Sequence, residues 1–265
     1  MIRLGAAIVS VTLLLAAFGP WVTPYDPSRQ ELALRLARPS LAHPFGIDEL
    51  GRDILSRVLA GARISLLVGL TVVSVSAAVG LALGLVGGYF GGLLDEVIGR
   101  VVDVLLAFPG ILLAIALVAV LGPSLVNVVL ALSVIGWVGY ARLVRGQVLR
   151  IRELEHVQAA RALGARAPRV LLRHVLPGTL PSVLVQATLG MASAVIAEAA
   201  LSFLGLGVQP PTPSWGTMLN GGRTHLLDAP HLTVFPGLAI AVLVLALNFL
   251  GDGLRDAIDP RRERR

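Results

Sequence analysis

The sequence contains no cysteine and no lysine, and all 22 of its basic residues are arginine. The lack of cysteine excludes disulfides, thiolate metal sites and cysteine nucleophiles. The lack of lysine excludes a Walker A phosphate loop, whose lysine reaches the nucleotide phosphates, and also a Schiff-base lysine. If ATP drives this protein, another chain must therefore hydrolyse it, and we expect no cofactor and no metal in this one.

Charged residues are also scarce. They make up 14% of the 265 residues, against 55% for hydrophobic residues, whereas globular proteins carry about a quarter charged residues. The mean hydropathy is +0.82. This composition predicts an all-α, polytopic membrane protein. The arginines flank the apolar runs, so the high isoelectric point indicates membrane edges rather than nucleic-acid binding.

Six apolar runs are candidates for transmembrane helices, each near the roughly 20 residues that a span needs. They cover residues 4–18, 64–86, 101–121, 126–143, 183–204 and 234–250. Arg3 precedes the first run as in a signal peptide, but no small-residue cleavage site follows, so we expect an uncleaved span. The chain then divides into a first helix with an outer amphipathic segment (1–62), a five-helix transmembrane domain (63–256) and a cytoplasmic tail (257–265).

Arginine distribution sets the expected orientation. The segment 141–177 holds eight arginines and two glutamates, whereas the segment 206–232 holds one arginine and one aspartate. By the positive-inside rule, the 141–177 loop is cytoplasmic. Six spans then place both termini in the cytoplasm, and the arginine-rich tail RDAIDPRRERR agrees with this.

The stretch EHVQAARALGARAPRVLLRHVLP, residues 155–177, predicts two short helices on the inner face. Gly164 suits the end of the first helix, and Pro168 suits the first turn of a second helix that stops before Pro177. Ala159, Ala160 and Gly164 leave one side almost bare, so a partner's surface could approach closely. From composition alone, a basic helix that binds anionic lipid head groups explains the segment better.

The spacing inside this stretch carries a resemblance. Gln158-Ala159-Ala160, three residues, Gly164, nine residues and then His174-Val175-Leu176-Pro177 is similar to the EAA…G…I-x-L-P loop of permease subunits in binding-protein-dependent ABC importers. Glutamine stands where that family has glutamate, and His174 stands where it has isoleucine. The resemblance implies a coupling helix that docks into the ATPase subunit through Gln158, Ala159, Ala160, Arg161, Gly164, Leu176 and Pro177.

Other stretches resemble the C-type subunit of the dipeptide, oligopeptide and nickel permease family. They are residues 43–70, 87–115, 197–219 and 235–261. In the first stretch, Asp48 is a candidate N-cap for an amphipathic helix that leads into the second span. In the third, the prolines of QPPTPSWG forbid a regular helix, and we expect Pro210, Pro211 and Trp215 to contribute to an outer gate or to the surface where a binding protein docks.

The resemblance implies a type I ABC importer permease fold in a bacterial or archaeal cytoplasmic membrane. It also implies three kinds of partner: a second, B-type permease, one or two ATPase subunits that bind ATP and Mg, and an extracytoplasmic substrate-binding protein. The expected cargo is di- or oligopeptides, with nickel or another small solute as the alternative within the family.

Two other classes of protein remain open from the residues alone. A secondary transporter driven by an ion gradient would need a polar site near the bilayer midplane, and Glu198, an acid inside an apolar run, is the candidate for it or for the gate. A membrane scaffold without transport would fit the composition but leaves the loop spacing unexplained. Asp95, Glu96 and Asp103 are better explained as helix-end charges paired with arginine than as an ion site.

Overall fold

The computed structural model describes residues 2–258 of the chain. These residues form helices and loops, with one isolated antiparallel bridge between Ile47 and Asp53, which confirms the all-α class. The α-helices are α1 (Ile2–Val22), α2 (Ile54–Phe90), α3 (Gly92–Leu106), α4 (Gly110–Leu121), α5 (Leu125–Ile151), α6 (Glu155–Ala162), α7 (Ala167–Val170), α8 (Leu176–Phe203), α9 (Trp215–Gly222) and α10 (His231–Ile258). Short helical turns are η1 (Leu32–Leu34), η2 (Leu171–Val175) and η3 (Arg223–His225).

Within residues 2–258, four helices are long and apolar enough to cross a membrane. They are α2, α5, α10 and the run Ala167–Phe203 that joins α7 to α8. The pair α3 and α4 would form a fifth span, and the apolar part of α1, Arg3–Gly19, is shorter than these. The chain is thus a multi-pass protein. The count of six spans and the placement of both termini inside stay predictions, and residues 259–265 of the expected tail lie outside the described residues.

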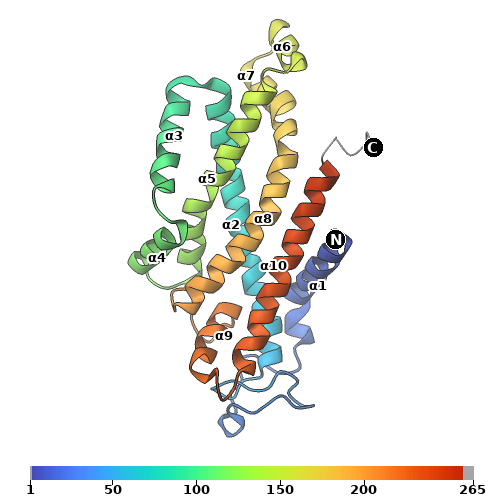
Figure 1. Cartoon of the computed structure of the whole chain (residues 1–265), viewed down its shortest axis with the longest axis vertical. Helices are drawn as coiled ribbons and strands as arrows, with labels where there is room; N and C mark the ends of the chain where they lie inside the picture. The colour runs from blue at the N-terminus through green and yellow to red at the C-terminus, as the bar shows by residue number, and fades with distance from the viewer. Residues whose placement is uncertain (1, 259–265) are drawn as a thin grey trace.

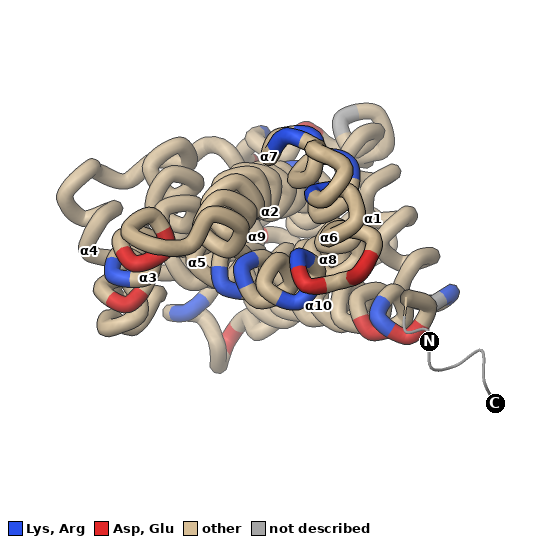
Figure 2. The backbone as a smooth tube through the Cα atoms, turned by 90° about the horizontal axis from the view of Figure 1, so that it is seen from above, with Lys and Arg blue, Asp and Glu red and all other residues tan. Residues whose placement is uncertain are grey.

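The molecule has two distinct ends. The helices α6 and α7 lie at one end, where α5 finishes and α8 begins, whereas α9 and the segment between α1 and α2 lie at the other (Figure 1). Seen from the α6 end, blue arginine segments gather over α5, α6 and α7 (Figure 2). This charge distribution agrees with the expectation that the α6 end faces the cytoplasm.

Close contact between α2 and α5 forms the centre of the bundle. A Cβ added to Gly80 of α2 would lie 2.4 Å from Tyr140 Cβ, and one added to Gly84 would lie 2.7 Å from the Ala141 carbonyl oxygen. Small residues let helix backbones approach in this way where no hydrophobic effect drives helices together in lipid. The buried side chains of Val144 and Val148 continue this contact toward the α6 end.

Two helix boundaries differ from the expectations. The third apolar run is not one straight helix, because α3 and α4 meet at an angle of 85°. Pro109 lies at this break, as the residue that precedes α4, and proline cannot continue the backbone hydrogen-bonding of a preceding helix.

The second helix of the 155–177 loop does not stop before Pro177, so that prediction is wrong. Leu171–Val175 is a π-helical turn, in which the Leu176 N–H donates to the Leu171 carbonyl five residues back. Pro177 follows in the first turn of α8, where a missing N–H is not required. The π turn thus lets one helical run pass from α7 through Pro177 into α8.

The helix cap before the second span is also different. Asp53, not Asp48, caps α2: its carboxylate accepts hydrogen bonds from the backbone N–H (2.8 Å) and the hydroxyl (2.7 Å) of Ser56. Asp48 is buried and pairs with Arg52 (2.6 Å) and Arg57 (3.4 Å). Both residues are of the type that N-caps prefer, but Asp53 directly precedes α2, whereas Asp48 is engaged by the two arginines.

Candidate functional site

The loop between α5 and α8 is built around Gly164. This glycine has a φ of +81°, so it adopts the left-handed conformation that glycine accepts without strain. Its N–H donates to the Arg161 carbonyl (2.9 Å), and the Ala165 N–H donates to the Ala160 carbonyl (3.0 Å). These two bonds form a Schellman motif, which ends α6 and turns the chain sharply into α7.

Buried and polar contacts fix α6 to the bundle. Val157 is fully buried in a cluster with Val148, Val170 and Val175. The guanidinium of Arg161 lies 4.7 Å from the ring centroid of Tyr89, near the end of α2, as in a cation–π contact. The loop is therefore attached to α2, to α5 and to the run of α7 and η2 that leads into α8.

The opposite side of the same loop is exposed in the described structure, residues 2–258. Ala159 is exposed, and an added Cβ at Gly164 would meet nothing within 4 Å. Leu163 is 89% exposed, so an apolar side chain projects beside the bare glycine. An apolar side chain next to a small-residue surface, with arginines around it, suits a protein partner.

The charges at this end connect α2, α3 and α5. Arg145 of α5 forms a bidentate pair with Asp95 of α3, at 2.5 and 2.6 Å. Arg152 donates to the Gly88 carbonyl near the end of α2 (2.9 Å). Glu96 pairs with Arg100 one turn further along α3 (2.9 Å). These contacts match the helix-end pairing expected of Asp95 and Glu96.

A second cluster lies at the opposite end, around Glu198 of α8. The Glu198 side chain is fully buried and accepts hydrogen bonds from the hydroxyls of Ser202 (2.7 Å) and Ser65 of α2 (3.5 Å). The hydroxyl of Ser214, the N-cap of α9, also contacts it. We call Glu198, Ser65, Ser202 and Ser214 the outer clamp, because these residues join α2, α8 and the start of α9 at the end that we expect to face outward.

Trp215 completes the contact between α9 and the spans. Its indole N–H donates to the Val58 carbonyl of α2 (2.9 Å) in a buried environment. A Cβ added to Gly61 would lie 3.0 Å from the indole, and one added to Gly216 would lie 2.5 Å from the Ala199 carbonyl. The start of α9 thus packs between the ends of α2 and α8 that lie away from α6 (Figure 1).

Comparison with known proteins identifies the family of this chain. The family model described as "Binding-protein-dependent transport system inner membrane component" matches residues 80–264. The chain belongs to this family, and it is a permease subunit of an ABC importer.

The glutathione transport system permease protein GsiD of Escherichia coli O157:H7 is 50% identical to the permease over 262 residues, 98% of this chain and 86% of the relative. The protein of the same name from Shigella flexneri serotype 5b is 52% identical over the same shares. Two structures of the MetNI methionine ABC transporter in inward-facing conformations have TM-scores of 0.63 and 0.64 at 19% and 20% identity. Each match covers 78% of the permease and 98% of the transporter chain, and shows the type I importer fold.

The structure of the permease places the expected site residues in two groups. Gln158, Ala159, Ala160, Arg161 and Gly164 lie together on α6 and its elbow, whereas Leu176 and Pro177 begin α8 beyond the π turn. At the other end, Glu198 and Trp215 meet through Ser214. Pro210 and Pro211 are exposed, joined by a cis peptide bond, and the structure records no hydrogen bond from them to the outer clamp.

Sequence reasoning missed two parts of the permease. One is the buried group of Asp48, Arg52 and Arg57, which only the folded segment before α2 brings together. The other is Gln186, a polar residue visible inside an apolar run, whose surroundings depend on three helices. His156 and His174 have ring centroids 6.3 Å apart, and residues 2–258 contain no group of three or more metal-ligating side chains.

Proposed function

We propose that this permease pairs with a second permease to import a small peptide-like solute across a bacterial or archaeal cytoplasmic membrane. The relatives in Escherichia coli and Shigella are named glutathione transport permeases, and glutathione is a tripeptide. These relatives share half of their residues with this chain over 98% of its length, which supports a peptide-like cargo for this permease as well. Short peptides are accordingly the first solutes to test, with nickel complexes second.

The observation that carries the proposal is the elbow at Gly164. It offers an exposed small-residue surface and Leu163 on one side, and buries Val157 on the other. Because Val157 anchors α6 to the bundle, a movement of a partner ATPase bound to the exposed side would be transmitted directly to the spans. ATP and Mg bind to that partner, and closure of the ATPases would tilt α5 and α8 as rigid bodies between inward- and outward-facing states.

At the opposite end we place the outer gate and the docking surface of the binding protein. The exposed Pro210 and Pro211 lie in the loop between α8 and α9, and the outer clamp ties both ends of that loop to the spans. Force applied to this loop by a binding protein would therefore reach α2 and α8. We also propose that the chain divides into an N-terminal part, 1–62, and a transmembrane domain, 63–256, which contains most of the segment that the family model matches, 80–264.

Reconstitution tests this function. The permease would be produced with its genomic neighbours, purified as a complex and inserted into vesicles with ATP on the ATPase side. We expect ATP hydrolysis that rises when the binding protein carries a short peptide, and uptake that requires ATP. Uptake driven by a proton or sodium gradient without ATP would instead establish a secondary transporter. Hydrolysis stimulated by nickel and not by peptides would correct the cargo.

A further inference from the structure

Two neighbouring cavities lie between α5 and α8, one after the other along the length of these helices. The first, of about 290 Å³, lies between α2, α4, α5 and α8, and its lining includes Ser76, Tyr140 and Gln186. The second, of about 450 Å³, lies between α5, α8 and α10 nearer the α6 end, and its lining includes Gln147, Ser182 and Arg255. Gln186 lines both cavities, so it stands where one meets the other.

The lining residues repeat at helical spacing. One face of α8 carries Ser182, Gln186, Gly190, Ser193 and Ala197, at steps of four, four, three and four residues. The facing side of α5 carries Leu132, Gly136, Tyr140, Leu143 and Gln147 at similar steps. Residues three and four apart lie on one side of a helix, so each helix presents one continuous face to both cavities. Polar and small residues such as Ser182, Gln186 and Gly190 lie on these faces beside apolar ones, in helices that are apolar enough to span a membrane.

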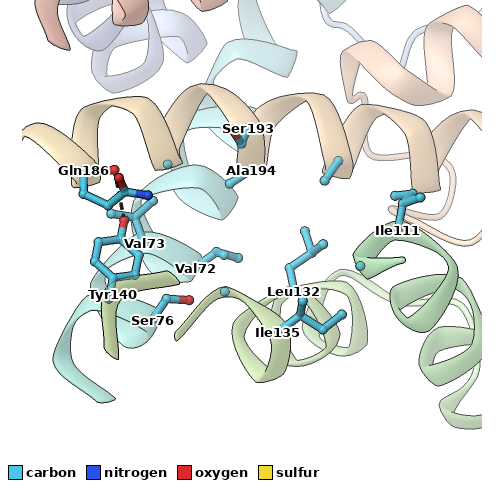
Figure 3. Close-up of a pocket in the computed structure, with 14 residues that line it drawn as sticks. Val72, Val73, Ser76, Ile111, Leu132, Ile135, Tyr140, Gln186, Ser193 and Ala194 are labelled. Atoms are coloured by element: carbon cyan, nitrogen blue, oxygen red, sulfur yellow. Dashed lines mark hydrogen bonds between the residues drawn. The ribbon is translucent and has the colours of Figure 1, made fainter. Parts of the chain in front are cut away.

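Polar groups line the first cavity (Figure 3), and the described residues do not satisfy all of them. Ser76 is 1% exposed, and its hydroxyl has no hydrogen-bond partner among the described residues. The Tyr140 hydroxyl donates a long bond of 3.4 Å to the backbone carbonyl of Gln186, and the structure records no bond from the Gln186 side-chain amide to another described residue. An unpaired polar group inside a membrane protein is costly unless water or a ligand satisfies it.

We propose that this α5–α8 face is the permease's part of the solute pathway, with the Gln186 amide as a contact for the peptide groups of the solute. This inference rests on the proposed function. A primary amide both donates and accepts hydrogen bonds, as a peptide unit does, so it suits a peptide better than a metal ion. The first cavity is close to the roughly 300 Å³ lower limit of small-molecule sites, which fits a short peptide segment. Arg255 adds a positive charge to the second cavity, which suits a solute that leaves with a carboxylate.

Thiol labelling tests the position of the pathway. Because the chain has no cysteine, Gln186→Cys, Ser193→Cys and Leu184→Cys each give a single thiol in this subunit. Leu184 is exposed on the opposite face of α8 and lines neither cavity. The assembled complex in lipid nanodiscs would be treated with a sulfonated maleimide, and labelling of the permease band would be measured. We expect labelling at positions 186 and 193 and at least tenfold slower labelling at 184. S-methylglutathione, delivered by the binding protein, should slow the reaction at 186.

Transport tests the role of the amide. Gln186→Leu should lower ATP-dependent uptake of a labelled dipeptide by about tenfold, as expected for the loss of one net hydrogen bond, while the binding protein still stimulates ATP hydrolysis. Thr188→Val is the matched control, because it removes a hydroxyl from the other face of α8 and touches neither cavity. Its uptake should equal that of the parent complex.

The outcomes separate the inference from the function on which it rests. ATP-dependent uptake by the parent complex, with no labelling at position 186 in any nucleotide state, would overturn the pathway and leave the importer function intact. Normal uptake by Gln186→Leu would overturn the role of the amide. Labelling at positions 186 and 193 in a complex whose solute uptake does not depend on ATP would support the pathway and contradict the proposed function.

Discussion

The side-chain amide of Gln158 donates a hydrogen bond to the backbone carbonyl of Glu153, at 3.2 Å. The bond spans the bend between α5 and α6, so it holds the start of α6 against the end of α5. Related permeases are expected to carry glutamate at this position, and an ionised carboxylate cannot donate a hydrogen bond. Gln158 therefore makes a hydrogen bond that an ionised glutamate at the same position could not make.

Gln158→Glu should loosen the start of α6. Loss of the bond at this exposed position would cost about 0.5–1 kcal/mol of local stability, so backbone amides of residues 154–162 should exchange with deuterium several times faster. Hydrogen exchange measured by mass spectrometry on the permease pair would show this. Gln209→Glu is the control, because Gln209 also donates to backbone carbonyls but in the loop at the other end. Equal exchange in α6 for both variants would remove the proposed role of the Gln158 amide.

Substitutions at Gly164 test whether the left-handed turn between α6 and α7 is needed for ATPase binding. Gly164→Val should reduce recovery of the ATPase with the permease, because a β-branched residue at a φ of +81° costs about 1–2 kcal/mol and would distort the turn. Gly164→Asn should be milder, since asparagine tolerates this conformation better. Co-purification of the ATPase, quantified against the permease, measures the effect. The position has open space around it, so a loss that is equal for valine and asparagine would show that bulk, and not backbone strain, is what matters there.

The outer clamp should dominate stability at the other end. Glu198→Ala would remove the carboxylate, leave the serine hydroxyls around it without that partner and open a cavity, which should lower the stability of the permease by about 2–4 kcal/mol. Glu198→Gln keeps the volume and an accepting oxygen, so it should lose less than half as much. Ser65→Ala should lose least, because its bond to Glu198 is 3.5 Å long. Thermal unfolding of the purified permease would rank the three, and a Gln variant as unstable as the Ala variant would contradict the hydrogen-bonding role.

Local chemistry explains what could be predicted from the sequence. The apolar runs indicated the spans, and Gly164 and Pro168 indicated the elbow, because glycine and proline act on the backbone of their own segment. The outer clamp could not be predicted in the same way. Ser65 and Glu198 are 133 residues apart, and nothing near either residue indicates the other. The predicted helix end before Pro177 was wrong for a similar reason, since the π turn that accommodates this proline has no local signature.

Gln186 shows a second limit of prediction from the sequence. A polar residue in an apolar run is visible in any sequence, yet its meaning depends on whether it faces lipid, another helix or a cavity. Only the packing of α2, α5 and α8 places it between two cavities. Glu198 was noticed by the same criterion and lies instead in a closed cluster of serines. Sequence reasoning thus singled out Glu198 and missed Gln186, because only the fold shows that Glu198 lies among serines and that Gln186 lies beside two cavities.

Leu163 provides the sharpest test of the docking surface, because it has little role in the permease's own fold. It is 89% exposed, so Leu163→Ala should leave thermal unfolding of the isolated permease unchanged. If the ATPase buries this side chain, the substitution should weaken ATPase binding by about 1.5–3 kcal/mol, the value for covering a leucine. Leu227→Ala is the matched control: Leu227 is fully exposed between α9 and α10 at the opposite end. Titration of the ATPase against the permease pair would measure both affinities. Equal affinities for the two variants would show that the ATPase does not cover Leu163, which would contradict the proposed docking surface.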